Sequence, residues 1–359
     1  MIQLKKIVSG CGFMAISYFA FAQDIQGTAF THQNWEVYCS NTGTCRAAGY
    51  QSDDGQQNPA SILLTRAAGP KQPVRAQFAL ANGGEDSFAA NQVKNIHFYI
   101  NDKDFGAVAV KGVESPLMGT LSAAQVNALL KQASQKTKMS FKNSHYVWNI
   151  SDAGMTAVLL KVDDLQKRIG TTGAIVKKGS ANESNVLMPQ PKLMIKKVKT
   201  ADQPYRTLKP NTKQYQSLHT RLLAANPKPK ETDFCEGIYN GADKGAKPQP
   251  IQLYKLTNGK VLATTLCVRG AYNEGYGAWV LDQSLQGQAT YVTEWATDIG
   301  SGEISSAFKG RGIGDCWLEQ SWIWDGQRYV QNQNRWTGMC KNIAAGGVWE
   351  LDQIEAVVK

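Results

Sequence analysis

The stretch NWEVYCSNTGTCRAAGY, residues 34–50, decides how the first half of the chain folds. Trp35–Cys39 and Cys45–Tyr50 have the pattern of two short strands, and the turn-forming residues 41–43 (Asn, Thr, Gly) lie between them. A disulfide between Cys39 and Cys45 would close this turn. The stretch therefore predicts an antiparallel hairpin at the start of an N-terminal domain.

Further strands and two helices follow this hairpin within residues 23–170. The expected strands are Ala60–Arg66, Val74–Leu80, Ile96–Ile100, Ala107–Val110, Lys138–Phe141 and Tyr146–Ile150. Ser122 and Gln125 form a capping-box pattern, and apolar residues at helical spacing follow it. The second helix is indicated by apolar residues at Met155, Val158, Leu159, Val162, Leu165 and Ile169. We expect an α+β domain in which this second helix packs one apolar face on a sheet.

The last part of the chain, residues 234–359, predicts a mainly β domain. Asn258-Gly259 separates Ile251–Leu256 from Lys260–Cys267, and Asp325-Gly326 separates Trp322–Trp324 from Tyr329–Gln331. Both dipeptides favour the tight turns of β-hairpins. The fold class predicted for the whole chain is therefore α+β: an antiparallel sheet domain with two helices, a basic connector, and a second, disulfide-stapled β domain.

The cysteines indicate an oxidising compartment. Seven are present, and removal of Cys11 with an N-terminal signal would leave an even number. Sequence alone does not choose among the pairings, but the sequential one brackets local hairpin-like units: Cys39–Cys45, Cys235–Cys267 and Cys316–Cys340. A redox motif and a zinc site are the alternatives; the spacing of Cys39 and Cys45 is too long for the first, and four histidines give little support to the second. We expect no metal and no cofactor.

The first residues predict export. Lys5 and Lys6 precede an apolar run that ends in Ala20-Phe21-Ala22, the pattern of a signal peptide over residues 1–22. A membrane anchor is the alternative, but the run is shorter than the roughly 20 residues that span a bilayer. Lipoprotein processing at Cys11 is a second alternative. The mature protein is expected to be periplasmic or secreted, with no transmembrane segment.

Residues 171–233 predict a basic connector with one short helix near Tyr215–Ala225. They hold 12 Lys or Arg against four Asp or Glu, together with several prolines. The net charge of the chain is +10, so the loss of Lys5 and Lys6 leaves +8, nearly all of it in this segment. Such a segment favours an anionic envelope component as partner, although the lysines could instead keep a linker soluble. Nucleic acid is not expected as a partner of an exported chain.

The search for catalytic motifs gives little. Gly310, Gly312 and Gly314 lack the βαβ context of a dinucleotide site and predict a turn before Cys316. Asp163 and Asp164 fall late in a helix, where a solvated face is expected. Asp315 lies four residues after Arg311, which predicts a structural ion pair or turn cap rather than a catalytic acid.

The tryptophans give the clearest indication of a binding surface. Seven of the nine lie at or after residue 279. Trp322 and Trp324 alternate with Ile323 and so share one face of a strand, as a binding platform or as core. The candidate binding residues are Trp322, Trp324, Trp336, Arg311 and Asp315.

Three groups of residues carry a family resemblance. They are residues 34–50, the VDDLQ of residues 162–166, and GRGIGDC (310–316) with WIWDG (322–326). The chain resembles the secreted bacterial family known as domain of unknown function 1176, and its Trp-x-x-x-Cys start is also similar to invasion-associated locus B proteins. The resemblance implies an exported envelope protein of Gram-negative bacteria and supplies no catalytic residue.

Two hypotheses of function result. The first is a non-enzymatic periplasmic or envelope-associated protein that binds an anionic envelope component, a glycan or another envelope protein, or that has a structural role. The second is an envelope-polymer hydrolase with an unrecognised carboxylate pair, which convergence around Asp315, Glu319 or Glu294 would favour.

Overall fold

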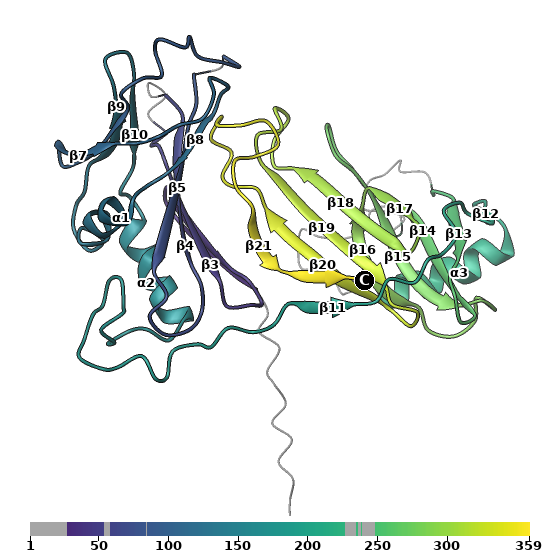
Figure 1. Ribbon diagram of the computed structural model, residues 1–359. Helices are drawn as coiled ribbons and strands as arrows, with labels where there is room; N and C mark the ends of the chain where they lie inside the picture. The colour runs from purple at the N-terminus through teal and green to yellow at the C-terminus, as the bar shows by residue number, and fades with distance from the viewer. Residues whose placement is uncertain (1–26, 54–57, 84, 227–234, 236–237, 239–247) are drawn as a thin grey trace, which may run out of the picture.

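The hairpin of residues 34–50 lies within a six-stranded antiparallel sheet in the computed structural model (Figure 1). Its strands are β2 (Trp35–Cys39) and β3 (Cys45–Tyr50), with Cys39 opposite Cys45. The structure describes residues 27–53, 58–83, 85–226, 235, 238 and 248–359. The expected signal peptide, residues 1–22, therefore lies outside the described residues.

The six strands follow the order β1-β2-β3-β4-β5-β8. The remaining bounds are Thr28–His32 (β1), Ala60–Arg66 (β4), Val74–Leu80 (β5) and Leu117–Thr120 (β8). Strands β2 to β5 match the expected strands. The indole of Trp35 lies against Gly49, where a Cβ atom would come within 2.3 Å of the ring, so this close approach requires glycine.

A second sheet and two helices complete the N-terminal lobe. The sheet has the order β10-β9-β6-β7, formed by Val147–Ile150, Met139–Lys142, His97–Ile100 and Lys103–Ala107. Helix α1 (Ala123–Leu130) starts at the expected capping box of Ser122 and Gln125. Helix α2 (Met155–Leu165) buries Met155, Val158, Leu159 and Val162 in the same core as Trp35 and Phe78.

Two expected elements differ from the structure. The strand expected at Ala107–Val110 is wrong, because Asn101 and Asp102 adopt positive φ angles of 50° and 62° and turn the chain directly into β7. The second helix ends at Leu165 rather than near Ile169, since Lys167 has a φ of 55° that no α-helix accommodates.

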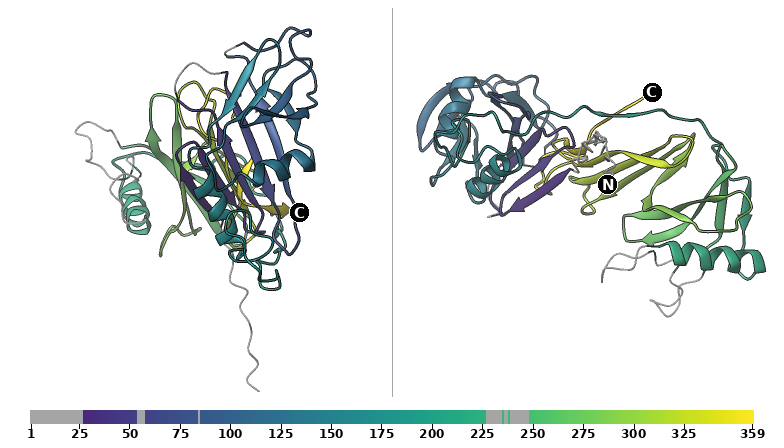
Figure 2. Two further views of the ribbon diagram at one scale, coloured as in Figure 1. Left: turned by 90° about the vertical axis from the view of Figure 1, so that its left-hand side faces the viewer. Right: turned by 90° about the horizontal axis from the view of Figure 1, so that it is seen from below.

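The basic segment after α2 takes part in both lobes. It contributes β11 (Leu193–Ile195), β12 (Arg206–Leu208) and α3 (Lys213–Ala225), the last close to the expected short helix. Tyr215, Leu218 and Leu222 of α3 pack in a core cluster with residues of the C-terminal lobe. Part of the segment expected as a connector is thus a layer of the second lobe (Figure 2, right).

The C-terminal lobe consists of two five-stranded antiparallel sheets. The first has the order β12-β13-β14-β15-β16, with β13 Ile251–Lys255, β14 Lys260–Arg269, β15 Glu274–Asp282 and β16 Thr290–Ala296. The second has the order β17-β18-β19-β20-β21, formed by Asp298–Gly300, Glu303–Lys309, Trp317–Trp324, Tyr329–Trp336 and Leu351–Ile354. Both expected hairpins are present, so the mainly β character of this lobe is confirmed.

The two hairpin turns meet in space. Asn258 Nδ2 donates a hydrogen bond of 2.7 Å to the carbonyl oxygen of Gly326. Beside this contact, a core cluster that includes Leu262, Trp322 and Trp324 fills the space between the two sheets. The turns therefore fix how the sheets are placed.

The lobes are joined through a shared core. Residues Ile343, Trp349 and Leu351 pack with Ala48 and Tyr50 of the N-terminal sheet. The last strand, β22 (Ala356–Val358), pairs in parallel with β11. The two lobes lie side by side, and the segment that carries β11 runs along the outside from one lobe to the other (Figure 1).

The cysteines pair sequentially, Cys39 with Cys45, Cys235 with Cys267 and Cys316 with Cys340. The first closes the turn between β2 and β3, and the other two lie in the C-terminal lobe. Among the described residues, no helix has both the length and the apolar character that a bilayer crossing requires.

Candidate functional site

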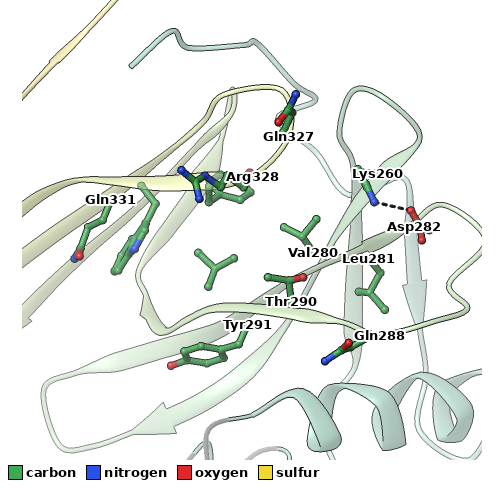
Figure 3. A pocket seen from close by; sticks show the side chains of 13 residues that line it. Lys260, Val280, Leu281, Asp282, Gln288, Thr290, Tyr291, Gln327, Arg328 and Gln331 are labelled. Carbon is green, nitrogen blue, oxygen red and sulfur yellow. Dashed lines mark hydrogen bonds and ion pairs between the residues drawn. The ribbon is translucent and has the colours of Figure 1, made fainter. Parts of the chain in front are cut away.

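A cleft opens between the two sheets of the C-terminal lobe, beside the meeting point of the hairpin turns (Figure 3). Its volume is about 350 Å³, within the size range of small-molecule sites. The lining residues come from five strands and two loops: Lys260, Val280, Leu281, Asp282, Gln288, Thr290, Tyr291, Val292, Trp322, Gln327, Arg328, Tyr329 and Gln331. The cleft thus combines residues far apart in the sequence.

Aromatic rings form part of its wall. Trp322 on β19 is 8% exposed, and Tyr329 on β20 and Tyr291 on β16 are half-buried. The ring of Tyr329 packs on Trp324, with centroids 5.3 Å apart. A tyrosine hydroxyl is protonated at neutral pH and can donate a hydrogen bond, and burial raises the pKa of Tyr329 further.

Polar side chains surround these rings. Gln288, Gln327 and Gln331 offer amide groups that both donate and accept hydrogen bonds. Figure 3 shows Arg328 and Gln331 on one side of the cleft, with Tyr291 and Gln288 on the other. The Arg328 side chain is 79% exposed and lies 4.0 Å from Asp325, so its charge remains available to a ligand.

The cleft's carboxylate is committed to an ion pair. Asp282 Oδ1 lies 2.7 Å from Lys260 Nζ across the β14–β15 pair. One paired carboxylate does not provide the separate acid and base that glycoside hydrolysis needs. The arrangement is suited to holding a hydroxyl-rich ligand by ring contacts and neutral hydrogen bonds.

The comparisons with known proteins agree with the resemblance seen in the sequence. A model of the family described as "Protein of unknown function (DUF1176)" matches residues 29–354. The chain belongs to the DUF1176 family. An uncharacterised relative, YpfG of Escherichia coli strain K12, is 27% identical over 321 residues, which cover 82% of this chain and 84% of the relative. No solved structure matches the chain. These comparisons do not show the expected similarity to invasion-associated locus B proteins.

The DUF1176 match spans both lobes and all of the cleft residues. The family name states no activity.

The candidate tryptophans are separated from one another. Trp322 lines the cleft, whereas Trp324 is fully buried and donates from Nε1 to Thr257 Oγ1 at 2.9 Å. Trp336 is half-buried and packs against the cluster that joins the lobes. A platform formed by Trp322 and Trp324 together is therefore wrong, because their shared face is turned into the core between the sheets.

Arg311 and Asp315 form an ion pair away from the cleft. Arg311 Nε lies 2.7 Å from Asp315 Oδ1, and the backbone N–H of Asn342 donates to Asp315 Oδ2 at 2.7 Å. Burial opposes ionisation of Asp315, but the hydrogen bonds from Arg311 and Asn342 hold its pKa below the usual value. The expected structural role agrees with these contacts. Asp315 also lies near Cys316 and Cys340, but their sulfur atoms are joined in a disulfide and cannot act as thiolate ligands.

The adjacent acids of α2 have opposite surroundings. Asp164 is exposed as expected and pairs with Lys161. Asp163 is fully buried and accepts backbone hydrogen bonds from Ile175 and Val176, so a solvated face is wrong for this residue. Arg66 lies 4.0 Å from Asp163, and the buried Arg168 pairs with Glu183 beside it. These charges anchor residues 171–187 to the N-terminal lobe.

A second hollow, of about 430 Å³, contains several carboxylates at the junction of the lobes. Glu355 lies 3.0 Å from Arg46, and Asp352 lies 2.7 Å from Arg335. Burial opposes ionisation of Glu355, but the charge of Arg46 and several hydrogen bonds lower its pKa below the usual value. A carboxylate kept ionised in this way, as Glu355 is, is a poor proton donor.

The sequence analysis missed most of the cleft, including Tyr291, Gln327, Arg328, Tyr329 and Gln331. A signal was present, because the last four follow the Asp325-Gly326 turn closely. Gln288 and Tyr291 had no local signal, since only the packing of the two sheets brings them to the cleft.

Proposed function

We propose that this DUF1176 protein is an exported, non-enzymatic binding protein of the bacterial envelope that holds a short glycan in the cleft of its C-terminal lobe. The single observation that carries the proposal is the composition of that cleft: Trp322, Tyr329 and Tyr291 beside a set of glutamine amides. Sugars present apolar ring faces edged by hydroxyl groups, so aromatic rings and amides together match their surface.

Export is supported by the three disulfides. Disulfides persist in oxidising compartments such as the periplasm and are rare in the cytosol. The signal-peptide pattern of residues 1–22 supports the same location. An envelope location in turn makes peptidoglycan-type sugars an abundant ligand class.

The polar groups of the cleft favour an acetamido sugar with an acidic substituent. The amides of Gln288, Gln327 and Gln331 can pair with acetamido groups, and the exposed Arg328 can pair with a carboxylate of the ligand. Lys260 and Asp282 neutralise each other and contribute no net charge.

A hydrolase has weaker support. Asp315, Asp352 and Glu355 are each paired with an arginine, and the pKa values of Asp315 and Glu355 are lowered. A glycosidase acid needs a raised pKa. Glu36 has a raised pKa, but it is only 2% exposed and is closed off by the backbone of Met339.

The proposal is tested by calorimetric titration of the chain from residue 23, the start expected after signal cleavage, with N-acetylglucosamine oligomers and muropeptides. We expect saturable binding that Gln331→Ala weakens about fivefold, as loss of one hydrogen bond predicts. Gln135→Ala, an exposed glutamine of the N-terminal lobe, is the matched control and should leave binding unchanged.

Tryptophan fluorescence supplies an independent readout, because Trp322 borders the cleft. Ligand that binds there should protect part of the emission from acrylamide quenching. Absence of binding to any of these sugars, or equal binding by wild type and Gln331→Ala, would contradict the proposal. Release of shortened sugars during the titration would instead favour the hydrolase.

A further inference from the structure

A two-stranded ribbon on the outside of the molecule carries exposed apolar side chains. It consists of β11 (Leu193–Ile195) and β22 (Ala356–Val358), paired in parallel with Met194 opposite Val357. Backbone hydrogen bonds from Lys359 to Ile195 and from Lys197 to Lys359 continue the pairing. Figure 1 shows β11 on the segment that passes along the outside of the two lobes.

Both faces of this ribbon carry exposed apolar side chains. Met194 and Val357 on one face are 58% and 38% exposed; on the other, Ile195 is buried against the protein while Leu193 and Val358 are 37% and 40% exposed. Because side chains alternate along a strand, Met194 and Val357 share the outward face, and Ile195 lies on the opposite one. The outward face therefore presents apolar side chains to the surroundings.

Lysines flank these apolar residues on the same face. Lys192 and Lys196 lie two positions before and after Met194, and Lys359 lies two positions after Val357. Lys192 is 3.2 Å from Glu355, which also pairs with Arg46. Lys196 has no carboxylate within ion-pair distance among the residues that the structure describes. The outward face thus alternates apolar and charged side chains; the same alternation places Glu355 there, paired with Lys192, and Lys196 and Lys359 add positive charge.

We propose that this ribbon face docks on the surface of a phospholipid bilayer that contains anionic headgroups. Lysine side chains at the edges can meet lipid phosphates while Met194 and Val357 enter the boundary between headgroups and acyl chains. The charge of the face complements an anionic surface. The apolar area is small, which suits a lipid surface better than a protein partner, because stable protein interfaces bury larger areas.

The inference deepens the envelope association in the proposed function, but it does not depend on the glycan cleft. None of the cleft-lining residues belongs to the ribbon. The vesicle assay contains no sugar and the sugar titration contains no vesicles. Failure of one proposal can therefore be told from failure of the other.

The test is sedimentation of the chain from residue 23 with vesicles of phosphatidylcholine alone or with added phosphatidylglycerol. We expect binding to the anionic vesicles only, and a decrease at high salt, because charges near a surface are screened. Lys196→Gln should weaken binding about fivefold, the effect of about 1 kcal/mol for one lysine near an anionic surface. Met194→Gln should weaken it by a similar factor of about five, through loss of apolar contact.

Matched controls lie on the other lobe. Lys131→Gln changes the same charge at an exposed site after α1, and Met118→Gln removes an exposed methionine from β8. Both should bind as wild type does. Equal binding of the wild type to both kinds of vesicle would overturn the proposal. So would an equal loss of vesicle binding in the ribbon variants and the control variants. A failure to bind vesicles, with self-association in sedimentation velocity that Met194→Gln abolishes, would assign the face to a second copy of the chain.

Discussion

Two contacts made by β-sheets hold this molecule together, and they are filled in different ways. Where residues 337–351 pack on the N-terminal sheet, Trp349 lies among Ala48, Ala79 and Ala81, and the contact is closed. Where the two C-terminal sheets face each other, the large rings of Trp322 and Trp324 lie between them and a cleft remains at one side. Small residues allow close approach, whereas large aromatic residues on one sheet hold the other at a distance and line the space that results.

The closed contact also contains a carboxyl group. Glu36 is buried beneath Met339, whose backbone N–H donates to Glu36 Oε1 at 3.0 Å, and Tyr50 donates to the same oxygen at 2.5 Å. The closed contact is therefore expected to govern stability and its pH dependence, whereas the open one is expected to govern binding.

The largest effect is expected from Trp349→Ala. This indole is buried and donates from Nε1 to Ser61 Oγ at 2.7 Å, so truncation leaves a cavity between the lobes and removes one buried hydrogen bond. We expect a loss of about 3 to 5 kcal/mol in the free energy of unfolding, measured by urea denaturation. Trp295→Ala, a half-buried indole of the C-terminal lobe, should cost clearly less. Equal costs for the two variants would mean that the lobe contact does not dominate stability.

Glu36→Gln should change how stability depends on pH. Burial raises the pKa of Glu36 from 4.5 to about 7, although hydrogen bonds from Tyr50, Met339 and Trp336 oppose the shift. Between these pH values the folded chain keeps a proton that the unfolded chain has lost, so stability falls as pH rises from about 4.5 to 7, by about 3 kcal/mol in total. The groups that face Glu36 are Tyr38, Tyr50, Trp336 and the backbone of Met339.

Glutamine is neutral and keeps an oxygen that both donors can reach. Urea unfolding at pH 5 and pH 8 should therefore show a smaller difference for Glu36→Gln than for wild type. Glu319→Gln, which removes a partly exposed carboxylate 3.9 Å from Arg335, serves as the control and should keep the wild-type difference. If Glu36→Gln kept the wild-type difference in stability between pH 5 and pH 8, the buried carboxyl group would not control the closed contact.

Elements set by local sequence patterns were more predictable than contacts between elements that lie far apart in the sequence. Strands β2 to β5, the capping box at Ser122 and the two hairpin turns follow local patterns of alternation and turn residues, and the structure contains them. Local patterns failed for Asp163, because its burial depends on Ile175 and Val176, which fold back over the helix. They failed for Tyr291 and Gln288 for a similar reason, since a cleft between two sheets depends on the spacing of elements that no short stretch encodes.

The smallest effect on stability, but a direct one on the cleft, is expected from the contact between the two hairpin turns. Asn258 adopts a φ of 55°, which asparagine and glycine tolerate, and its Nδ2 donates to the Gly326 carbonyl at 2.7 Å. Asn258→Gly keeps the backbone conformation and removes this hydrogen bond, which should cost about 1 kcal/mol of stability. Because Lys260, Gln327 and Arg328 adjoin the two turns, the same change should loosen the cleft and weaken sugar binding in the calorimetric titration.

Gly326 has a φ of 101°, so the reciprocal change Gly326→Ala adds backbone strain and should cost more stability than Asn258→Gly. If Asn258→Gly lowered stability yet bound sugar like the wild type, the turns would set the packing of the sheets without shaping the ligand site.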